Sequence, residues 1–446
     1  MSKNSLVVPS ILPGFMELLP NEQLAFNAMI KTIQQSYELF GFVPLDTPII
    51  ERAEVLLAKA GTETSKQTYL FKKGGDDQAL RFDLTVPLAR YVSQHFHELV
   101  FPFRRYQIGK VYRGEKPQKG RFREFYQCDV DIIGKGELGL VNDAEILAVA
   151  YFTFTRLGLG RFIIKINNRK ILSGFIDDLG FQDRSKELMV LIDKIDKIGE
   201  GAFLEEAQRL DLNKKQVDAL IHFLKINANS SDTLDKLRKL KIENGVFLKG
   251  LNELEEVVKY IKYLNIPESN WKIDLSIARG LDYYTGTVYE TILTEYPQLG
   301  AVCSGGRYDN LAKYYTDQKL PGVGISLGLT RLFYQLNELN LVNKIASTPT
   351  KVLLLPLTES LSETFDIATK LRLESIPTEV YVVQKNLGEK LKYASKMGIE
   401  YVVIIGEKEL KESSVLLKNM RTGNQKKIMQ KDFVKLIKSE LENKDQ

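Results

Sequence analysis

The chain has 446 residues, of which 27% are charged and 44% hydrophobic, and its formal net charge is +5 at pH 7. At roughly 150 residues per domain, this length corresponds to about three domains. The composition is typical of a folded protein and excludes a disordered one. Apolar stretches such as 352–355 are far shorter than the ~20 residues of a membrane-spanning helix. We therefore expect a soluble protein with no membrane segment and no secretory signal, located in the cytoplasm.

Cysteine and histidine are too scarce for the commonest catalytic and metal sites. The sequence has two cysteines and three histidines, at Cys128, Cys303, His95, His97 and His222. Their spacing matches neither a zinc site nor a disulfide framework, so we expect no metal site made by the protein and structural roles for the histidines. The small positive charge permits an anionic partner without requiring one. If the chain is an enzyme, arginines and carboxylates must handle charge.

The first 160 residues predict a helix, two strands and a second helix. Apolar residues recur at helical spacing over 18–42, and 42–50 is extended. Segments 100–108 and 124–133 are rich in β-forming residues and flank a charged, glycine-containing loop, which predicts two antiparallel strands. Helical spacing returns over 142–158.

The remainder divides into a helical stretch, a second set of strands and a C-terminal α/β pattern. Spacing is helical from about 180 to 268, which indicates an insertion in the main domain. The elements expected next are strands over 271–277 and 287–294, a glycine-rich turn at 304–306, a helix over 309–315, and a glycine-rich segment, 322–328, leading into another helix. From 346 onward, strands over 352–356, 379–383 and 401–405 alternate with helices over 362–373 and 387–397, followed by a hairpin over 413–427 and a helix over 431–441. This alternation predicts a mostly parallel sheet.

Three common phosphate-binding and hydrolase motifs are absent from the sequence. The nearest string to a P-loop, 109–116, has Glu115 where lysine is required. The run 322–328 has three residues between its second and third glycines, so it misses the dinucleotide fingerprint. No Gly-x-Ser-x-Gly elbow exists.

Four segments instead concentrate polar residues within strand-like or glycine-rich sequence: 81–85, 112–131, 278–286 and 322–331. Arginine binds phosphate bidentately at any working pH, and an aromatic ring beside it can stack a nucleobase. The side chains that alternate along 125–131 should project from one strand face; they are Phe125, Gln127, Asp129 and Asp131. Together these groups suit a nucleoside triphosphate and a small amine-bearing acid.

Each segment also has an ordinary structural role open to it, and singly none is decisive. These roles are a helix cap for Asp83 and Thr85, a surface ion pair for Arg113 and Glu115, a strand-end charge for Arg279, core packing for Tyr283 and Tyr284, and close strand packing for Gly322, Gly324 and Gly328. The occurrence of all four segments in this order favours the functional interpretation.

In this order the segments resemble the histidyl-tRNA synthetase family of class II aminoacyl-tRNA synthetases. The most specific match is 279–290 (Arg-Gly-Leu-Asp-Tyr-Tyr-Thr-Gly-Thr-Val-Tyr-Glu), similar to the signature of histidine specificity. Other matches are 81–90 to the amino-acid-binding loop, 113–131 and 322–331 to the second and third class II motifs, and 304–309 to another family signature.

The resemblance implies an α+β fold: a class II synthetase-like antiparallel-sheet catalytic domain, residues 1–345, with a helical insertion at about 180–268, plus an α/β C-terminal anticodon-binding domain, residues 346–446. It also implies ATP as substrate, Mg²⁺, L-histidine and tRNA(His) as ligands, and a homodimer.

Residue roles follow from the same resemblance. Histidine would be held by Asp83, Leu84, Thr85, Arg113, Gln127, Asp131, Arg279, Tyr283 and Tyr284. ATP would be held by Arg113, Glu115, Arg121, Phe125 and Arg331, with Phe125 stacked on adenine. Arg113 and Arg279 would be catalytic, acting on the α-phosphate. One position departs from the family: Thr330 stands where class II enzymes usually carry an acidic residue.

The chemistry needs no side-chain nucleophile. A histidine carboxylate is already ionised at pH 7, so its attack on the α-phosphate requires positioning and cations rather than a base. Three alternatives remain: a catalytically inactive paralogue that regulates the ATP phosphoribosyltransferase of histidine biosynthesis, a class II synthetase of another specificity, and a purely tRNA-binding protein. The regulatory paralogue typically lacks the C-terminal domain and the arginine equivalent to Arg279, and this chain has both.

Overall fold

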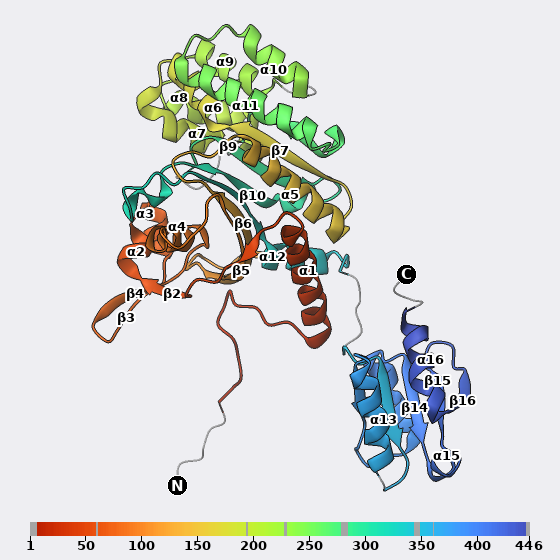
Figure 1. Ribbon diagram of the computed structural model, residues 1–446. Coiled ribbons are helices and arrows are strands. Elements are labelled where there is room, and N and C mark those ends of the chain that lie inside the picture. Colours follow the sequence, from red (N-terminus) through yellow and green to blue (C-terminus); the bar gives the residue numbers. More distant parts are fainter. Residues whose placement is uncertain are drawn as a thin grey trace. The chain divides into compact units, whose positions relative to one another are not determined.

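The computed structural model describes residues 7–58, 61–192, 195–226, 230–277, 284–342, 348–359 and 361–442. Residues 1–16 and 29–341 form one compact unit, and residues 17–28 and 342–446 form the other. The first unit is built on a large, mainly antiparallel sheet and the second on a smaller α/β sheet (Figure 1). The α+β class expected from the sequence is confirmed.

The large sheet of the first unit has eight strands, and only its outermost pairs are parallel. In spatial order they are β1 (Val43–Pro44), β5 (Phe103–Tyr112), β6 (Glu124–Ile133), β11 (Gly322–Gly328), β10 (Ala301–Tyr308), β9 (Thr287–Leu293), β7 (Phe162–Asn168) and β8 (Trp271–Ile273). The predicted antiparallel pair is β5 and β6. On β6, Cys128, Val130 and Ile132 are fully buried on one face, which leaves the alternate residues facing the other way.

The segment 304–306 is part of a strand, so the prediction of a glycine-rich turn there was wrong. Gly305 pairs with Ile325 of β11 and with Tyr289 of β9. A Cβ on Gly305 would lie 2.1 Å from the carbonyl oxygen of Gly324, so the glycine permits close strand contact rather than a turn. The helix expected over 309–315 is a short 3-10 helix, η4 (Leu311–Tyr314).

Helices of the first unit cover the buried face of the sheet. The long amphipathic helix is α1 (Pro20–Glu38), whose Tyr37 hydroxyl donates to the carbonyl oxygen of Cys128 at 3.0 Å. Helix α5 (Val141–Leu157) ends at Gly158, which has a left-handed φ of 63°. Helix α12 (Leu329–Glu338) follows β11 directly and packs beside β6.

A smaller three-stranded sheet and three helices precede β5. Its strands lie in the order β2 (Ile50–Arg52), β4 (Asp76–Leu80) and β3 (Leu70–Lys73). The helices are α2 (Ala53–Leu57), α3 (Thr62–Gln67) and α4 (Thr85–Gln94). The Asp83 carboxylate accepts the backbone N–H of Val86 at 2.9 Å, so this residue stabilises the first turn of α4.

The stretch between β7 and β8 is helical, with two short 3-10 turns. Its elements are α6 (Arg169–Asp178), η1 (Gln182–Arg184), α7 (Ser185–Ile192), α8 (Ile195–Arg209), α9 (Lys214–Leu224), α10 (Ser230–Lys239), α11 (Gly245–Tyr263) and η2 (Glu268–Asn270). Gly174 allows helices α6 and α11 to pack closely, since a Cβ at this position would lie 2.3 Å from the backbone nitrogen of Phe247.

The second unit is a five-stranded sheet with helices on both faces. The strands lie in the order β13 (Thr378–Val380), β12 (Val352–Pro356), β14 (Tyr401–Ile405), β15 (Ser414–Asn419) and β16 (Gln425–Met429). The first three are parallel and the last two form an antiparallel hairpin. Helices α13 (Ser362–Leu373) and α16 (Gln430–Glu442) pack on one face and α14 (Leu387–Met397) on the other; a short helix, α15 (Glu407–Lys411), precedes β15. Of the helices that the structure describes, none combines the length and apolar character that a bilayer span requires.

Candidate active site

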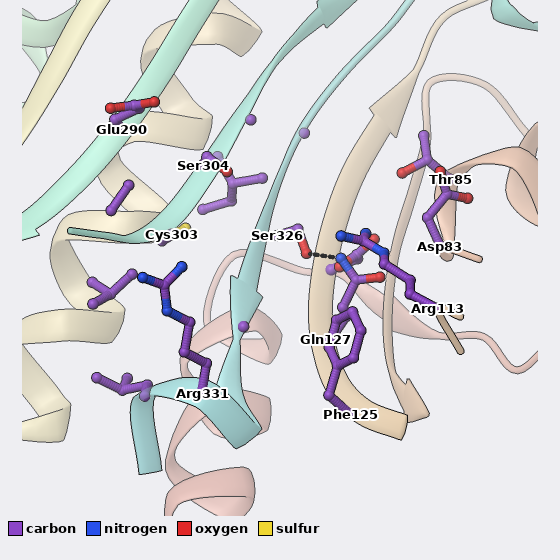
Figure 2. Close-up of a pocket in the computed structure, with 18 of the residues that line it drawn as sticks. Asp83, Thr85, Arg113, Phe125, Gln127, Glu290, Cys303, Ser304, Ser326 and Arg331 are labelled. Atoms are coloured by element: carbon purple, nitrogen blue, oxygen red, sulfur yellow. Dashed lines mark hydrogen bonds between the residues drawn. The ribbon is translucent and has the colours of Figure 1, made fainter. Parts of the chain in front are cut away.

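A cavity of about 500 Å³ lies on the open face of the large sheet. Its walls come from β6, β9, β10 and β11, from the start of α12, and from the loop before α4 (Figure 2). This volume is within the range of roughly 300–1,000 Å³ typical of small-molecule sites. The residues that line it include charged and polar side chains as well as aromatic rings.

The four alternate residues of β6 all line this cavity, as the period-2 pattern predicted. They are Phe125, Gln127, Asp129 and Asp131. The neighbouring strand β11 contributes small residues opposite them, because Gly324 pairs with Asp131, Ser326 with Asp129, and Gly328 with Gln127. These small residues leave room above the strand, so the β6 side chains are accessible from the cavity.

Asp131 is held at the base of the cavity by two polar neighbours. The Tyr308 hydroxyl donates to Asp131 Oδ1 at 2.7 Å, and Arg105 Nη2 lies 2.7 Å from Asp131 Oδ2. The Arg105 side chain is completely buried. Burial raises the pKa of Asp131, and the Arg105 cation counteracts this in part. The carboxyl is thus fixed in position, with its charge supported by a buried arginine.

Two further carboxyls lie in the same region. Burial raises the pKa of Asp83, while its hydrogen bond from Val86 and the Arg113 cation oppose the shift. Burial raises the pKa of Asp129 to about 7. A group of buried carboxyls with few cations is a favourable environment for a positively charged amine.

Arg113 lies between two aromatic rings at the edge of the cavity. Its guanidinium carbon is 4.4 Å from the ring centroid of Phe82 and 5.0 Å from that of Phe125. Its Nε also donates to the Phe82 carbonyl oxygen at 3.3 Å. Figure 2 shows Arg113 on the same side as Asp83 and Thr85, across the cavity from Arg331. Cations on two sides of one cavity suit a substrate that carries phosphate groups.

The loop between β5 and β6 and the first turn of α12 contribute the remaining charges. Glu115 Oε2 lies 3.7 Å from Arg121 Nη1. Arg331 Nη2 donates to the Leu299 carbonyl oxygen at 3.0 Å, and burial together with the nearby Arg121 cation lowers its pKa. The adjacent Thr330 hydroxyl accepts the backbone N–H of Tyr126 at 2.8 Å. At the position that departs from the family pattern, a hydroxyl therefore joins α12 to β6.

The structure brings most of the predicted site residues to this cavity. Those lining it are Asp83, Thr85, Arg113, Glu115, Arg121, Phe125, Gln127, Asp131, Tyr284 and Arg331. Leu84 is fully buried, and its carbonyl oxygen accepts Arg105 Nη2 at 3.4 Å instead of lining the cavity. Arg279 and Tyr283 lie outside the described residues.

Several lining residues were not among the predicted binding residues, for example Glu290, Ser304 and Ser326. Ser326 occupies the alternate position between two glycines of β11. Interpretation of 322–328 as a strand with period-2 alternation would have placed it on the cavity face. Among the described residues, no group of three or more metal-ligating side chains could hold a metal ion.

An antiparallel sheet that carries arginines, carboxylates and an aromatic side chain around one cavity is the arrangement of a class II aminoacyl-tRNA synthetase. The family model for histidyl-tRNA synthetase matches residues 14–332, and that for the anticodon-binding domain matches residues 351–440. The chain belongs to the histidyl-tRNA synthetase family.

Individual relatives agree with this assignment. Histidine–tRNA ligase of Clostridium tetani is 57% identical over 438 residues, which cover 98% of this chain and all of the relative. The enzyme of the same name from Clostridium acetobutylicum is 47% identical, with 95% of this chain and 99% of the relative covered. The crystal structure of histidyl-tRNA synthetase from Nostoc sp. PCC 7120 is 38% identical, covers 98% of this chain and 100% of that one, and superposes with a TM-score of 0.89.

Proposed function

We propose that the chain activates L-histidine with ATP to histidyl-adenylate and pyrophosphate, and then transfers histidine to the 3′ end of tRNA(His). The observation that carries this proposal is the distribution of charge in one cavity. The carboxyls of Asp83 and Asp131 line the same cavity as the guanidinium groups of Arg113 and Arg331. A zwitterionic amino acid and an anionic nucleotide can therefore meet in one site.

In the first step, the residues position two substrates rather than exchange protons. The α-ammonium group and backbone of histidine would be held by a set of polar side chains, Asp83, Thr85, Gln127 and Asp131. Its imidazole would lie against the two neighbouring tyrosines, Tyr283 and Tyr284. The substrate carboxylate would then face Arg113 and attack the α-phosphate in line. Arg113 stabilises negative charge that builds on the phosphate, which is the main requirement of this reaction.

The nucleotide would occupy the side of the cavity formed by the β5–β6 loop and α12. Adenine would stack on Phe125, and the triphosphate would meet Arg121 and Arg331, with Glu115 as a hydrogen-bond acceptor. Arg279 is proposed as a second cation at the α-phosphate. Mg²⁺ would enter with the triphosphate and neutralise its charge. Histidine binding by Leu84 would involve its backbone, since its side chain is buried.

In the second step, the terminal hydroxyl of tRNA(His) attacks the acyl carbon of the adenylate. We propose that a phosphate oxygen of the adenylate takes the proton. The α/β unit, proposed as residues 346–446, would bind the anticodon, while residues 1–345, with the helical insertion at about 180–268, carry the catalytic site. A homodimer and a cytoplasmic location complete the proposal.

The regulatory-subunit alternative is disfavoured. A relative named histidine–tRNA ligase is 57% identical along its whole length, and the anticodon-binding family model matches residues 351–440. A regulatory paralogue has no need for the arginines that surround the cavity.

The decisive experiment is amino-acid-dependent ATP–pyrophosphate exchange with purified protein, Mg²⁺ and each of the twenty amino acids separately. We expect exchange with histidine alone. Exchange with a different amino acid would overturn the specificity, and folded protein without exchange for any amino acid would favour the regulatory role.

A further inference from the structure

Asp129 is a buried carboxyl in the cavity for which the proposed reaction supplies no role. It is 2% exposed and lies on β6 between Gln127 and Asp131. Its Oδ1 atom is buried and has no hydrogen-bond partner. Burial of a carboxylate is costly unless hydrogen bonds or a cation compensate it, so an unpaired buried oxygen calls for an explanation. Its neighbour across the strand pair is Ser326 of β11.

Ser326 connects Asp129 to Gln127. Ser326 stands directly opposite Asp129 in the register of β6 and β11, and its hydroxyl counteracts the rise in the Asp129 pKa through a side-chain hydrogen bond. Its Oγ atom also accepts Gln127 Nε2 at 2.8 Å, the contact drawn as a dashed line in Figure 2. The three side chains therefore form a continuous polar chain along one face of β6 and β11.

The direction of these hydrogen bonds follows from the number of protons available. A serine hydroxyl has one proton to donate and two lone pairs that accept. An ionised Asp129 can only accept a hydrogen bond, so the Ser326 hydroxyl donates its hydrogen to the carboxylate. Ser326 must then accept from the Gln127 amide, and that requires the NH₂ group of Gln127 to face Ser326. The Gln127 carbonyl oxygen is left on the other side, where it is buried and without a partner.

We propose that Asp129 and Ser326 are positioning residues that hold the Gln127 amide with its carbonyl oxygen toward the amino-acid substrate. This inference deepens the proposed function and rests on it. An amide can rotate by half a turn at little cost, and only its partners decide which end faces the cavity. With the pair in place, the cavity offers an acceptor to an ammonium or N–H group. Without the pair, the amide can present its NH₂ group, which a cationic ammonium cannot use.

Two competing roles for Asp129 lead to different expected results. If its carboxylate touches the substrate directly, Ser326 should matter little. If the chain of hydrogen bonds only stabilises the sheet, substitutions should lower the melting temperature and affect both substrates equally. The substitutions Ser326→Ala, Ser326→Thr and Asp129→Asn separate these cases. Threonine retains the hydroxyl, whereas asparagine replaces the carboxylate, which can only accept, with an amide that no longer obliges Ser326 to donate.

The test is ATP–pyrophosphate exchange at pH 8, with the KM of histidine and of ATP measured separately for each variant. S326A and D129N should each raise the KM of histidine by about tenfold or more, because a hydrogen bond to a charged group is lost. The KM of ATP should change by less than about twofold. S326T should restore the KM of histidine to within about threefold, and the double variant should be no worse than either single variant, since both act through Gln127.

Three results would overturn the proposal. An unchanged KM of histidine in S326A, with D129N impaired, would assign direct substrate contact to Asp129. Additive losses in the double variant would show that the two residues act independently. Equal increases in both KM values, with a lower melting temperature, would leave only a structural role. Exchange by the unsubstituted enzyme is measured first, so failure of the proposed function is recognised before any variant is interpreted.

Discussion

Arg307 and Asp143 join strand β10 to helix α5 through a buried ion pair, in which Arg307 Nη2 lies 2.5 Å from Asp143 Oδ2. The Asp143 side chain is fully buried and that of Arg307 is 7% exposed. The backbone of Arg307 also accepts the N–H of Thr285 at 2.8 Å. The pair therefore supports the segment that carries Tyr284 into the cavity.

Removal of the Asp143 carboxylate should destabilise the protein severely. Asp143→Ala leaves the Arg307 cation buried without its partner, which typically costs about 3–5 kcal/mol of the free energy of unfolding. Urea unfolding followed by tryptophan fluorescence measures this loss. Asp309→Ala is the matched control, because Asp309 lies 3.7 Å from the same guanidinium and is 31% exposed. We expect a loss of about 1 kcal/mol for the control, and equal losses for both variants would contradict the interpretation.

Substitution of Arg113 should reduce catalysis without unfolding the protein. Its guanidinium lies between the rings of Phe82 and Phe125 at the edge of the cavity. Arg113→Ala should lower the kcat of ATP–pyrophosphate exchange by about 100-fold or more, as expected when a group that stabilises developing charge is removed. Arg113→Lys should recover little, since an ammonium lacks the planar fork that stacks on rings and binds phosphate bidentately. Recovery to near the parent rate would mean that only a point charge is needed.

A methyl group on β11 should displace Asp131. A Cβ at Gly324 would lie 2.1 Å from Asp131 Oδ1, whereas a Cβ at Gly328 would meet nothing within 4 Å. Gly324→Ala should therefore raise the KM of histidine by about tenfold or more and lower the melting temperature. Gly328→Ala should leave the melting temperature within about 2 °C of the parent. A Gly324→Ala variant with an unchanged KM of histidine would argue against substrate contact by Asp131.

Stability should depend on pH through Asp129. Its pKa is about 7 in the folded protein, against an ordinary value of 3.8. The folded state binds this proton more tightly, so the associated stability is complete below pH 4 and is lost as the pH rises to about 7, by up to roughly 1.4 kcal/mol per pH unit. The charged or titratable groups around it are Tyr37, Asp131, Cys128, Arg105, Asp83 and Cys303.

The Asp129→Asn variant lacks this titratable group, so the parent protein is compared with this variant at each pH. The free energy of unfolding of the parent should fall relative to that of D129N between pH 5 and pH 7, and the difference should level off above pH 8. Urea unfolding at each pH provides the measurement. Parallel pH dependences for the two proteins would show that Asp129 is already ionised at pH 5.

Patterns of short range along the chain predicted the elements and part of the site. The alternation from Phe125 to Asp131 predicted which side chains share a face, and the position of Asp83 before a helix allowed its role as a cap. Glycine was misleading at 304–306, because a strand that needs close neighbours and a turn that needs conformational freedom use the same residue. The pairing of Gln127 with Ser326 joins residues 199 positions apart. It depends on the register between β6 and β11, and no local pattern determines that register.

The pleat of β6 restricts how this site can change. Each residue that faces the cavity alternates with one that faces the interior, such as Cys128, Val130 and Ile132. Exchange of one cavity-facing side chain for another leaves the interior intact, so point substitutions can retune substrate choice. Insertion or deletion of a single residue would instead turn the interior residues into the cavity and bury the carboxyls. In this strand, evolution can therefore substitute individual residues, but the number of residues must stay the same.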